Sequence, residues 1–212
     1  MRPSARLFLA SASPRRRELL AQAGFQFELV NGAEVDETPQ PGEPPERLVA
    51  RLALAKARAG REALAKTRPG LLGKETGSPV VLGADTEVVL DGRVFGKPAD
   101  EATGVAMLLA LSDRSHEVLS AVCVLAGTRE RVAISHSRVR FRKLDAAEVR
   151  DYWATGEPRD KAGGYAIQGR GAAFVSHLEG SRSGVVGLPL EEAAELLRGF
   201  GITPTVAASG QR

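Results

Sequence analysis

The feature that most constrains the fold is a short apolar run that leads directly into a helix start. Residues 7–10 are uniformly apolar, which is typical of a strand buried on both faces. Ser13 suits the N-cap of a following helix, and Pro14 suits its first position. We therefore expect a buried strand followed by a helix, the repeating unit of α/β proteins.

The same junction offers hydrogen-bond donors to an anion. The first turn of a helix leaves backbone N–H groups unbonded at the positive end of its dipole. Arg15 and Arg16 would add guanidinium groups to that turn. Phosphate groups bind at such helix N-termini. An ordinary strand-to-helix turn with solvated arginines fits this segment equally well.

Strand and helix patterns alternate along the rest of the chain, and an Asp91-Gly92 pair marks a hairpin turn. The order combines parallel-type and hairpin connections, so we expect an α/β fold. It would hold a mixed twisted sheet with flanking helices, in two lobes around a central cleft. The remaining predicted strands are residues 25–30, 79–84 continued by 87–90, 115–126 and 131–142. The predicted helices are residues 45–66, 100–111, 145–154 and 188–200, and residues 67–79 form an exposed loop.

Size and composition favour an ordinary globular protein. All 212 residues fit a single domain, and the small polar residues 203–212 predict a flexible tail. The net charge is +3 and aromatic residues make up 5%, too few for an obvious base-stacking surface. Apolar runs are shorter than a membrane span, and the N-terminus lacks a secretory pattern, so we expect a cytoplasmic protein. Cys123 stands alone in an apolar run and is expected to be buried.

Among the single carboxylates of the sequence, Asp85 is the strongest candidate for a catalytic residue. It follows an apolar run and a Gly83-Ala84 pair, so we expect it at the end of a strand, where sheet enzymes place ligands. There it could deprotonate water, bind a divalent cation, or do both. Taken alone, an aspartate at a strand end more often has a structural role, in which it only accepts hydrogen bonds from the backbone amides of a turn.

Two lysines and a glutamate extend this candidate site. Lys97 lies between glycine and proline, twelve positions after Asp85 and across the expected hairpin. Lys56 lies on an alanine-rich helix face. The alternative without a function is that its aliphatic stem packs along the surface while its ammonium group stays in solvent. With the two arginines of the first helix, these lysines suit a triphosphate of about four charges. Glu37 is the candidate second carboxylate for Mg²⁺ or Mn²⁺, since both take oxygen ligands.

A glycine-rich stretch at residues 160–169 could recognise a flat ligand. Tyr165 could stack or pack there, and Gln168 could read a polar edge with both donor and acceptor atoms. A tight structural loop is the alternative. The three histidines have no ligand-like spacing, so we expect no histidine metal site.

In this order, these segments resemble the Maf family of nucleoside triphosphate pyrophosphatases. The resemblance covers residues 7–197 and implies a fold similar to that of the inosine triphosphate pyrophosphatases. The matching segments are residues 9–16, 36–37, 51–53 with 56–57, 83–86, 96–98, 156–169 and 186–190.

The resemblance implies hydrolysis of a nucleoside triphosphate between its α- and β-phosphates, giving the monophosphate and pyrophosphate. The sequence of residues 160–165 resembles that of the family branch that acts on dTTP and UTP, including modified uridine nucleotides. Such an activity keeps these nucleotides out of nucleic acids. By the same resemblance, Asp85 accepts the proton of the attacking water, and Glu37 and Asp85 hold Mg²⁺ or Mn²⁺.

The resemblance also implies which residues bind the substrate. The positions linked to base preference are Arg15, Thr86 and Gln168. The positions linked to the phosphates are Ser11, Arg16, Lys56 and Lys97. A nucleoside triphosphate is thus the expected partner, with a possible homodimer, no membrane and no stable nucleic-acid complex.

Two other functions use a similar cleft. A regulatory nucleotide- or nucleic-acid-binding protein, acting in septum formation or division arrest, would not need Asp85 and would bind DNA in a salt-sensitive way. A hydrolase for damaged purine triphosphates such as dITP would select the base by contacts other than those around Gln168.

Overall fold

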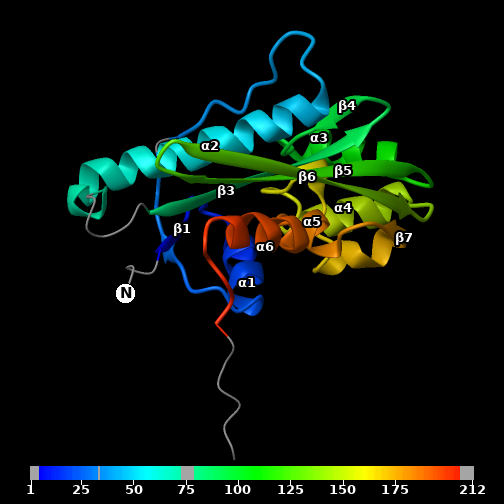
Figure 1. Ribbon diagram of the computed structural model, residues 1–212. Coiled ribbons are helices and arrows are strands. Elements are labelled where there is room, and N and C mark those ends of the chain that lie inside the picture. Colours follow the sequence, from blue (N-terminus) through cyan, green and yellow to red (C-terminus); the bar gives the residue numbers. More distant parts are fainter. Residues whose placement is uncertain (1–4, 33, 73–78, 206–212) are drawn as a thin grey trace, which may run out of the picture.

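The computed structural model describes residues 5–32, 34–72 and 79–205. Its centre is a seven-stranded mixed sheet with helices on both faces, which confirms the predicted fold class (Figure 1). The strands are β1 (Leu7–Leu9), β2 (Glu28–Leu29), β3 (Val80–Leu90), β4 (Arg93–Phe95), β5 (Ser115–Ala126), β6 (Arg129–Phe141) and β7 (Val175–Glu179). The helices are α1 (Pro14–Gln22), α2 (Pro45–Thr67), α3 (Glu101–Leu111), α4 (Ala146–Ala154), α5 (Arg182–Val186) and α6 (Leu190–Gly199). Short 3-10 turns span Pro69–Leu72, Ala162–Gly164 and Arg170–Phe174.

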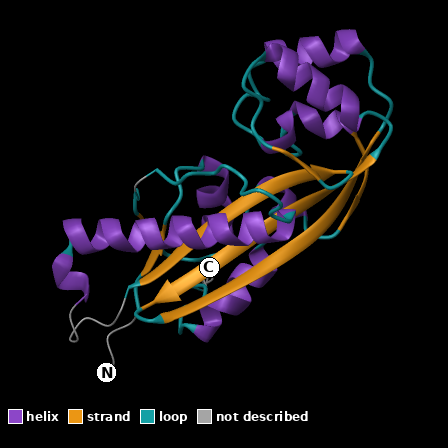
Figure 2. Cartoon of the chain, turned by 90° about the horizontal axis from the view of Figure 1, so that it is seen from above, coloured by secondary structure: helices purple, strands orange, loops and turns teal. Residues whose placement is uncertain are grey.

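The strand order is β2-β1-β3-β5-β6-β7, with β4 paired to β3. β1 runs parallel to β2 and β3, whereas β3, β5, β6 and β7 form antiparallel pairs. The long strands β3, β5 and β6 run from one group of helices to a second group at their far end (Figure 2). They therefore connect the two lobes.

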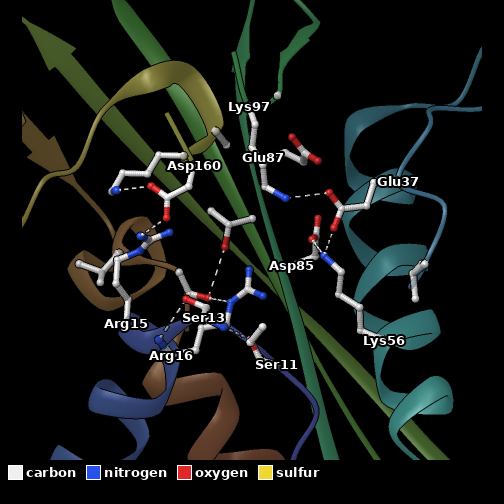
Figure 3. A pocket seen from close by; sticks show the side chains of 18 of the residues that line it. Ser11, Ser13, Arg15, Arg16, Glu37, Lys56, Asp85, Glu87, Lys97 and Asp160 are labelled. Carbon is white, nitrogen blue, oxygen red and sulfur yellow. Dashed lines mark hydrogen bonds and ion pairs between the residues drawn. The ribbon is translucent and has the colours of Figure 1, made fainter. Parts of the chain in front are cut away.

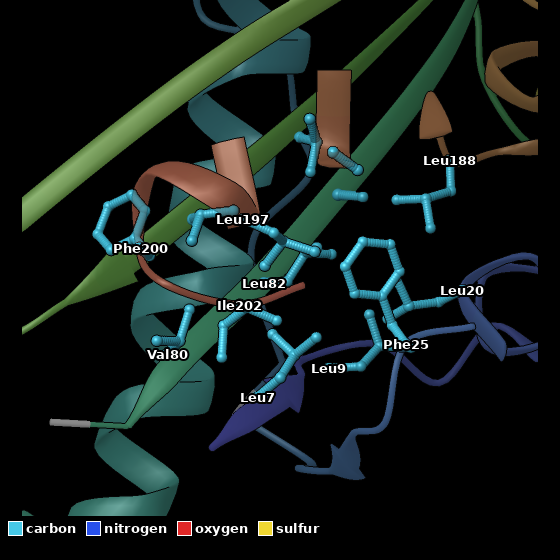
Figure 4. Close-up of a cluster of buried hydrophobic side chains, with 14 residues drawn as sticks. Leu7, Leu9, Leu20, Phe25, Val80, Leu82, Leu188, Leu197, Phe200 and Ile202 are labelled. Carbon is cyan, nitrogen blue, oxygen red and sulfur yellow. The ribbon is translucent and has the colours of Figure 1, made fainter. Parts of the chain in front are cut away.

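Three apolar clusters hold these layers together. On one sheet face, α1 and α6 pack onto β1 and β3 through residues such as Leu20, Leu197 and Leu82 (Figure 4). On the other face, the small residues of α2 pack against β3 and β5. A third cluster joins α3 and α4 to the far ends of the strands, around Leu108 and Phe141.

Local signals set several element ends where the sequence predicts them. The hydroxyl of Ser13 accepts a hydrogen bond from the amide of Arg16, and Pro14 opens α1. Asp100 and Asp145 cap α3 and α4 in the same way. Asp91 and Gly92 both have positive φ (51° and 73°), as the hairpin between β3 and β4 requires.

Gly83 allows α2 to lie directly on β3. A Cβ atom at this position would stand 2.5 Å from both the carbonyl oxygen of Ala53 and the amide nitrogen of Ala57. Only a glycine permits so close an approach of helix backbone to strand. The contact brings Lys56, next to Ala57, over the strand that carries Asp85.

Two strand predictions were wrong. Asp85 does not end a strand but lies within β3, because the ladder with β5 continues through it: Asp85 pairs with Ala121, and Thr86 with Ser120. The polar Asp85-Thr86 pair predicts a strand end, but the backbone pairing of β3 with β5 continues the strand through it. The strand predicted at residues 25–30 is only Glu28–Leu29, since it pairs with the three-residue β1 alone.

Two predicted irregular segments lie partly outside the described residues. Residues 73–78 of the predicted loop and 206–212 of the predicted tail are among those not described. At the start of that tail, the amide of Thr205 donates to the carbonyl of Gly24 at 2.8 Å. Cys123 is fully buried in β5, as predicted, and burial raises the pKa of its thiol to about 12.

Candidate active site

A cleft of about 1070 Å³ brings the sequence-predicted residues together. They come from six separate parts of the chain: the β1–α1 junction, the loop before α2, α2 itself, β3, the segment after β4 and the segment after α4. The predicted residues that line the cleft are Ser11, Arg15, Arg16, Glu37, Lys56, Asp85, Thr86, Lys97 and Gln168.

One wall of the cleft carries a chain of alternating charges. The Lys56 ammonium lies 2.5 Å from Oδ1 of Asp85 and 2.6 Å from Oε1 of Glu37. Lys97 lies 3.0 Å from Oε2 of Glu37, so the two lysines approach the carboxylates from opposite sides (Figure 3). Lys56 is therefore paired with two acids on the same wall and is not a lysine that only snorkels into solvent.

Partial burial opposes the charged form of Glu37, but the hydrogen bonds and charges of both lysines outweigh this effect. The net result is a pKa of Glu37 below its ordinary value. Glu37 is thus a carboxylate at neutral pH. Asp85 is only 4% exposed, and its Oδ2 is a buried oxygen with no hydrogen-bond partner in the described part of the chain.

Glu87 is a cleft residue that the sequence analysis missed. It lies two positions after Asp85 on β3 and is only 9% exposed. Burial, together with the nearby charges of Asp85 and Glu37, raises the pKa of Glu87 to about 7. In a continuous strand, side chains two positions apart point to the same face, which would place Glu87 beside Asp85. The predicted strand end at Asp85 hides this relation.

The opposite wall is the start of α1, with its two arginines (Figure 3). Ser11 accepts a hydrogen bond from the amide of Ser13 at 3.2 Å, and Ser13 accepts from the amide of Arg16. These bonds fix the turn that leads into α1, whose first residues line the cleft. Arg15 reaches across to Asp160 at 3.4 Å, so an ion pair joins α1 to the glycine-rich segment.

Arg16 is held by two backbone carbonyls. Its Nε donates to Gly187 at 2.8 Å, and its Nη1 donates to Ala84 at 2.7 Å. Burial lowers the pKa of Arg16, although the charge of Asp85 opposes this. Thr86 bonds to Ser120 at 2.9 Å and to the same Gly187 carbonyl at 3.4 Å. Arg16 and Thr86 therefore share one anchor at the end of α5.

A second set of polar contacts positions the segment that carries Gln168. The carboxylate of Glu157 accepts from the Tyr152 hydroxyl at 2.7 Å and from the amides of Arg170 and Gly171 at 3.0 and 3.1 Å. The Tyr152 hydroxyl in turn accepts from the amide of Ala166 at 3.0 Å. No local sequence pattern pointed to this role of Glu157.

Tyr165 packs into the wall. Its hydroxyl lies 2.8 Å from Nε2 of His116, and its ring meets Phe141 edge-to-face with centroids 4.8 Å apart. Burial lowers the pKa of His116 to about 4, so this histidine is neutral at physiological pH. Gln168 is exposed and is one of the residues that line the cleft.

The carboxylates of the cleft fit a divalent cation. Oxygens from Glu37 and Asp85 already converge on one positive charge, the Lys56 ammonium, and Oδ2 of Asp85 lacks a partner in residues 5–32, 34–72 and 79–205. Mg²⁺ is usually held by one or two carboxylates together with substrate phosphates. Within the described residues, no three His, Cys, Asp or Glu side chains are grouped closely enough to hold a metal ion. A cation here would therefore take further ligands from a bound substrate or water.

The chain is similar over most of its length to proteins of one known family. The sequence pattern of the family described as Maf-like protein matches residues 6–200. The chain belongs to the Maf family. A relative named dTTP/UTP pyrophosphatase in Aromatoleum aromaticum is 51% identical over 210 residues, covering 95% of this chain and 98% of the relative. Relatives of the same name are 52% identical in Methylococcus capsulatus, over 93% of this chain and 92% of the relative, and in Alkalilimnicola ehrlichii, over 92% and 93%.

No helix within the described part of this Maf protein is long and apolar enough to cross a membrane.

Proposed function

We propose that this protein hydrolyses dTTP and UTP, and modified pyrimidine triphosphates, to the monophosphate and pyrophosphate. The observation that carries the proposal is one cleft in which an acid pair, two lysines and a helix start with two arginines face each other. The similarity to relatives named dTTP/UTP pyrophosphatase supports the substrate class.

In the reaction, water attacks the α-phosphorus and the bond from that phosphorus to the bridging oxygen breaks. Asp85 accepts the proton of the attacking water, because its carboxylate is fixed by Lys56 and its buried Oδ2 has no hydrogen-bond partner in the part of the chain that the structure describes. Negative charge develops on the departing pyrophosphate. Lys56, Lys97 and the arginines of α1 stabilise that charge at short range in a partly buried site.

Glu37 and Asp85 would hold Mg²⁺ or Mn²⁺, which when bound supplies positive charge to the departing pyrophosphate. In the structure, Lys56 occupies the space between these two carboxylates. Its ammonium is then available to a phosphate once another cation neutralises the acids.

Base selection falls to Arg15, Thr86 and Gln168, which all line the cleft. The exposed amide of Gln168 can donate to and accept from the edge of a pyrimidine. The Glu157 contacts fix its segment, and the shared Gly187 carbonyl fixes Thr86. Polar groups held in fixed positions favour selectivity between bases. A base that cannot form hydrogen bonds with them leaves them unpaired and therefore binds more weakly.

The test is a panel of natural and modified triphosphates, including dTTP, UTP and dITP, assayed for pyrophosphate release and for the nucleotide product. We expect dTMP and UMP with equimolar pyrophosphate, and weak activity on dITP. Preference for dITP would favour a damaged-purine hydrolase. Absence of turnover, together with salt-sensitive DNA binding, would favour the regulatory alternative, which the relatives' names do not support.

A further inference from the structure

Glu87 has a side chain that the proposed chemistry does not use. Side chains two positions apart on a strand point to the same face, so Glu87 extends the row begun by Asp85. Its backbone pairs with Leu119 of β5, which fixes its position in the ladder. Figure 3 shows it in the cleft, beside Lys97 and above Asp85.

One oxygen of the Glu87 carboxyl group is buried and has no hydrogen-bond partner among the described residues. This oxygen is Oε2, and the residue as a whole is only 9% exposed. Lys56 and Lys97 contact Glu37 and Asp85 instead. A buried carboxyl oxygen without a donor is costly, which points to a donor supplied by a ligand.

The charge balance of this wall indicates what that ligand is. Three acids, Glu37, Asp85 and Glu87, face two ammonium groups, so with all three ionised the wall carries one excess negative charge. An anionic substrate brings more negative charge to the same space. A divalent cation with its water ligands supplies both the missing positive charge and hydrogen-bond donors.

We propose that Glu87 supports the divalent-cation site without being a direct ligand: its carboxylate accepts hydrogen bonds from water molecules bound to the cation that Glu37 and Asp85 hold, and this raises the affinity of the cleft for the cation. This inference rests on the cation site of the proposed function. It assigns to Glu87 a role in cation affinity that is separate from proton transfer by Asp85.

Mn²⁺ binding to the substrate-free protein tests the inference, with free Mn²⁺ measured by electron paramagnetic resonance at a pH above neutrality. We expect Glu87→Gln to weaken binding by about tenfold or more, as for other residues that support a metal ligand. Glu87→Asp should retain part of the affinity because it keeps the charge. Glu117→Gln, at an exposed position on β5 outside the cleft, is the matched control and should bind as the wild type does.

Asp85→Asn and Glu37→Gln are titrated in the same way. If they weaken binding while Glu87→Gln does not, Glu87 has no part in the site and this inference alone is wrong. If all three bind Mn²⁺ as the wild type does, the cation site of the proposed function is wrong as well. Equal losses in Glu87→Gln and Glu87→Asp would indicate a packing effect and would also overturn the inference.

A thermal measurement guards against a folding artefact. A cation that binds only the folded state raises Tm, and the rise depends on its affinity. Mn²⁺ should therefore raise the Tm of the wild type more than that of Glu87→Gln, even if the two proteins start from different values. Equal rises at the same Mn²⁺ concentration would contradict the role assigned to Glu87.

Discussion

Gly83→Ala should impair catalysis without touching any charged group of the cleft. The new Cβ would stand 2.5 Å from the Ala53 carbonyl oxygen and the Ala57 amide nitrogen, whereas ordinary contact begins near 3.4 Å. Helix α2 and strand β3 must therefore separate by about 1 Å. Lys56 rides on that helix, so its 2.5 Å contact with Asp85 cannot persist unchanged.

Two magnitudes follow from this displacement. Overpacking of a core contact costs about 1–3 kcal/mol of unfolding free energy. Misplacement of a catalytic group by about 1 Å can lower the rate on the order of 100-fold. We expect kcat/KM for dTTP to fall by that larger factor while the protein remains folded.

The assay is pyrophosphate release from dTTP, with circular dichroism and Tm measured on the same preparation. Gly199→Ala is the matched control, because it lies at the end of α6 and a Cβ there has no heavy atom within 4 Å among the described residues. The control should match the wild type in both measurements. Wild-type kcat/KM in Gly83→Ala would refute the argument that this glycine sets the distance between Lys56 and Asp85.

Three further predictions address pH, base recognition and the metal. Because the folded-state pKa of Glu87 is raised to about 7, its carboxyl favours the folded state below its ordinary pKa of 4.5. That contribution is lost as the pH rises toward 7, so the unfolding free energy of metal-free protein should fall over this range, and Glu87→Gln should flatten the slope. Glu157→Ala leaves the amides of Arg170 and Gly171 without their acceptor; it should cost about 1–3 kcal/mol and raise KM for dTTP more than it lowers kcat. Chelation of divalent cations should abolish pyrophosphate release, and added Mg²⁺ or Mn²⁺ should restore it; undiminished release in excess chelator would contradict the proposed cofactor.

Local chemistry made parts of the fold predictable. Ser13, Asp100 and Asp145 are caps whose side chains bond to amides within three residues, so the signal lies entirely within a short window. The Asp91-Gly92 turn is equally local, since both residues tolerate positive φ. These features appear in the structure where the sequence predicts them.

The error at Asp85 has a different origin. A polar Asp-Thr pair after an apolar run predicts a strand end, but pairing with Ala121 and Ser120 carries the strand onward. That pairing joins segments more than thirty positions apart and has no local signature. The predicted break at Asp85 and Thr86 also separates Glu87 from Asp85, whereas in the continuous strand the two side chains share one face.

The candidate site was predictable in its members but not in its connections. Local patterns made Lys56, Lys97 and Glu37 candidates, the resemblance to the Maf family assigned them to one site, and the structure places all three in one cleft. That Lys56 bridges two acids depends on the close packing of α2 against β3 at Gly83. The Glu157 contacts likewise join residues up to fourteen positions apart across an irregular segment.

Turnover of dTTP by Asp85→Asn tests the central claim most directly, with the wild type and the control variant Asp91→Asn measured alongside. The control substitution should be tolerated because asparagine, like aspartate, adopts the positive φ of that turn. If Asp85 accepts the proton of the attacking water, Asp85→Asn should remain folded and lose turnover by about 100-fold or more, while Asp91→Asn keeps it. Unchanged turnover in folded Asp85→Asn would contradict the account.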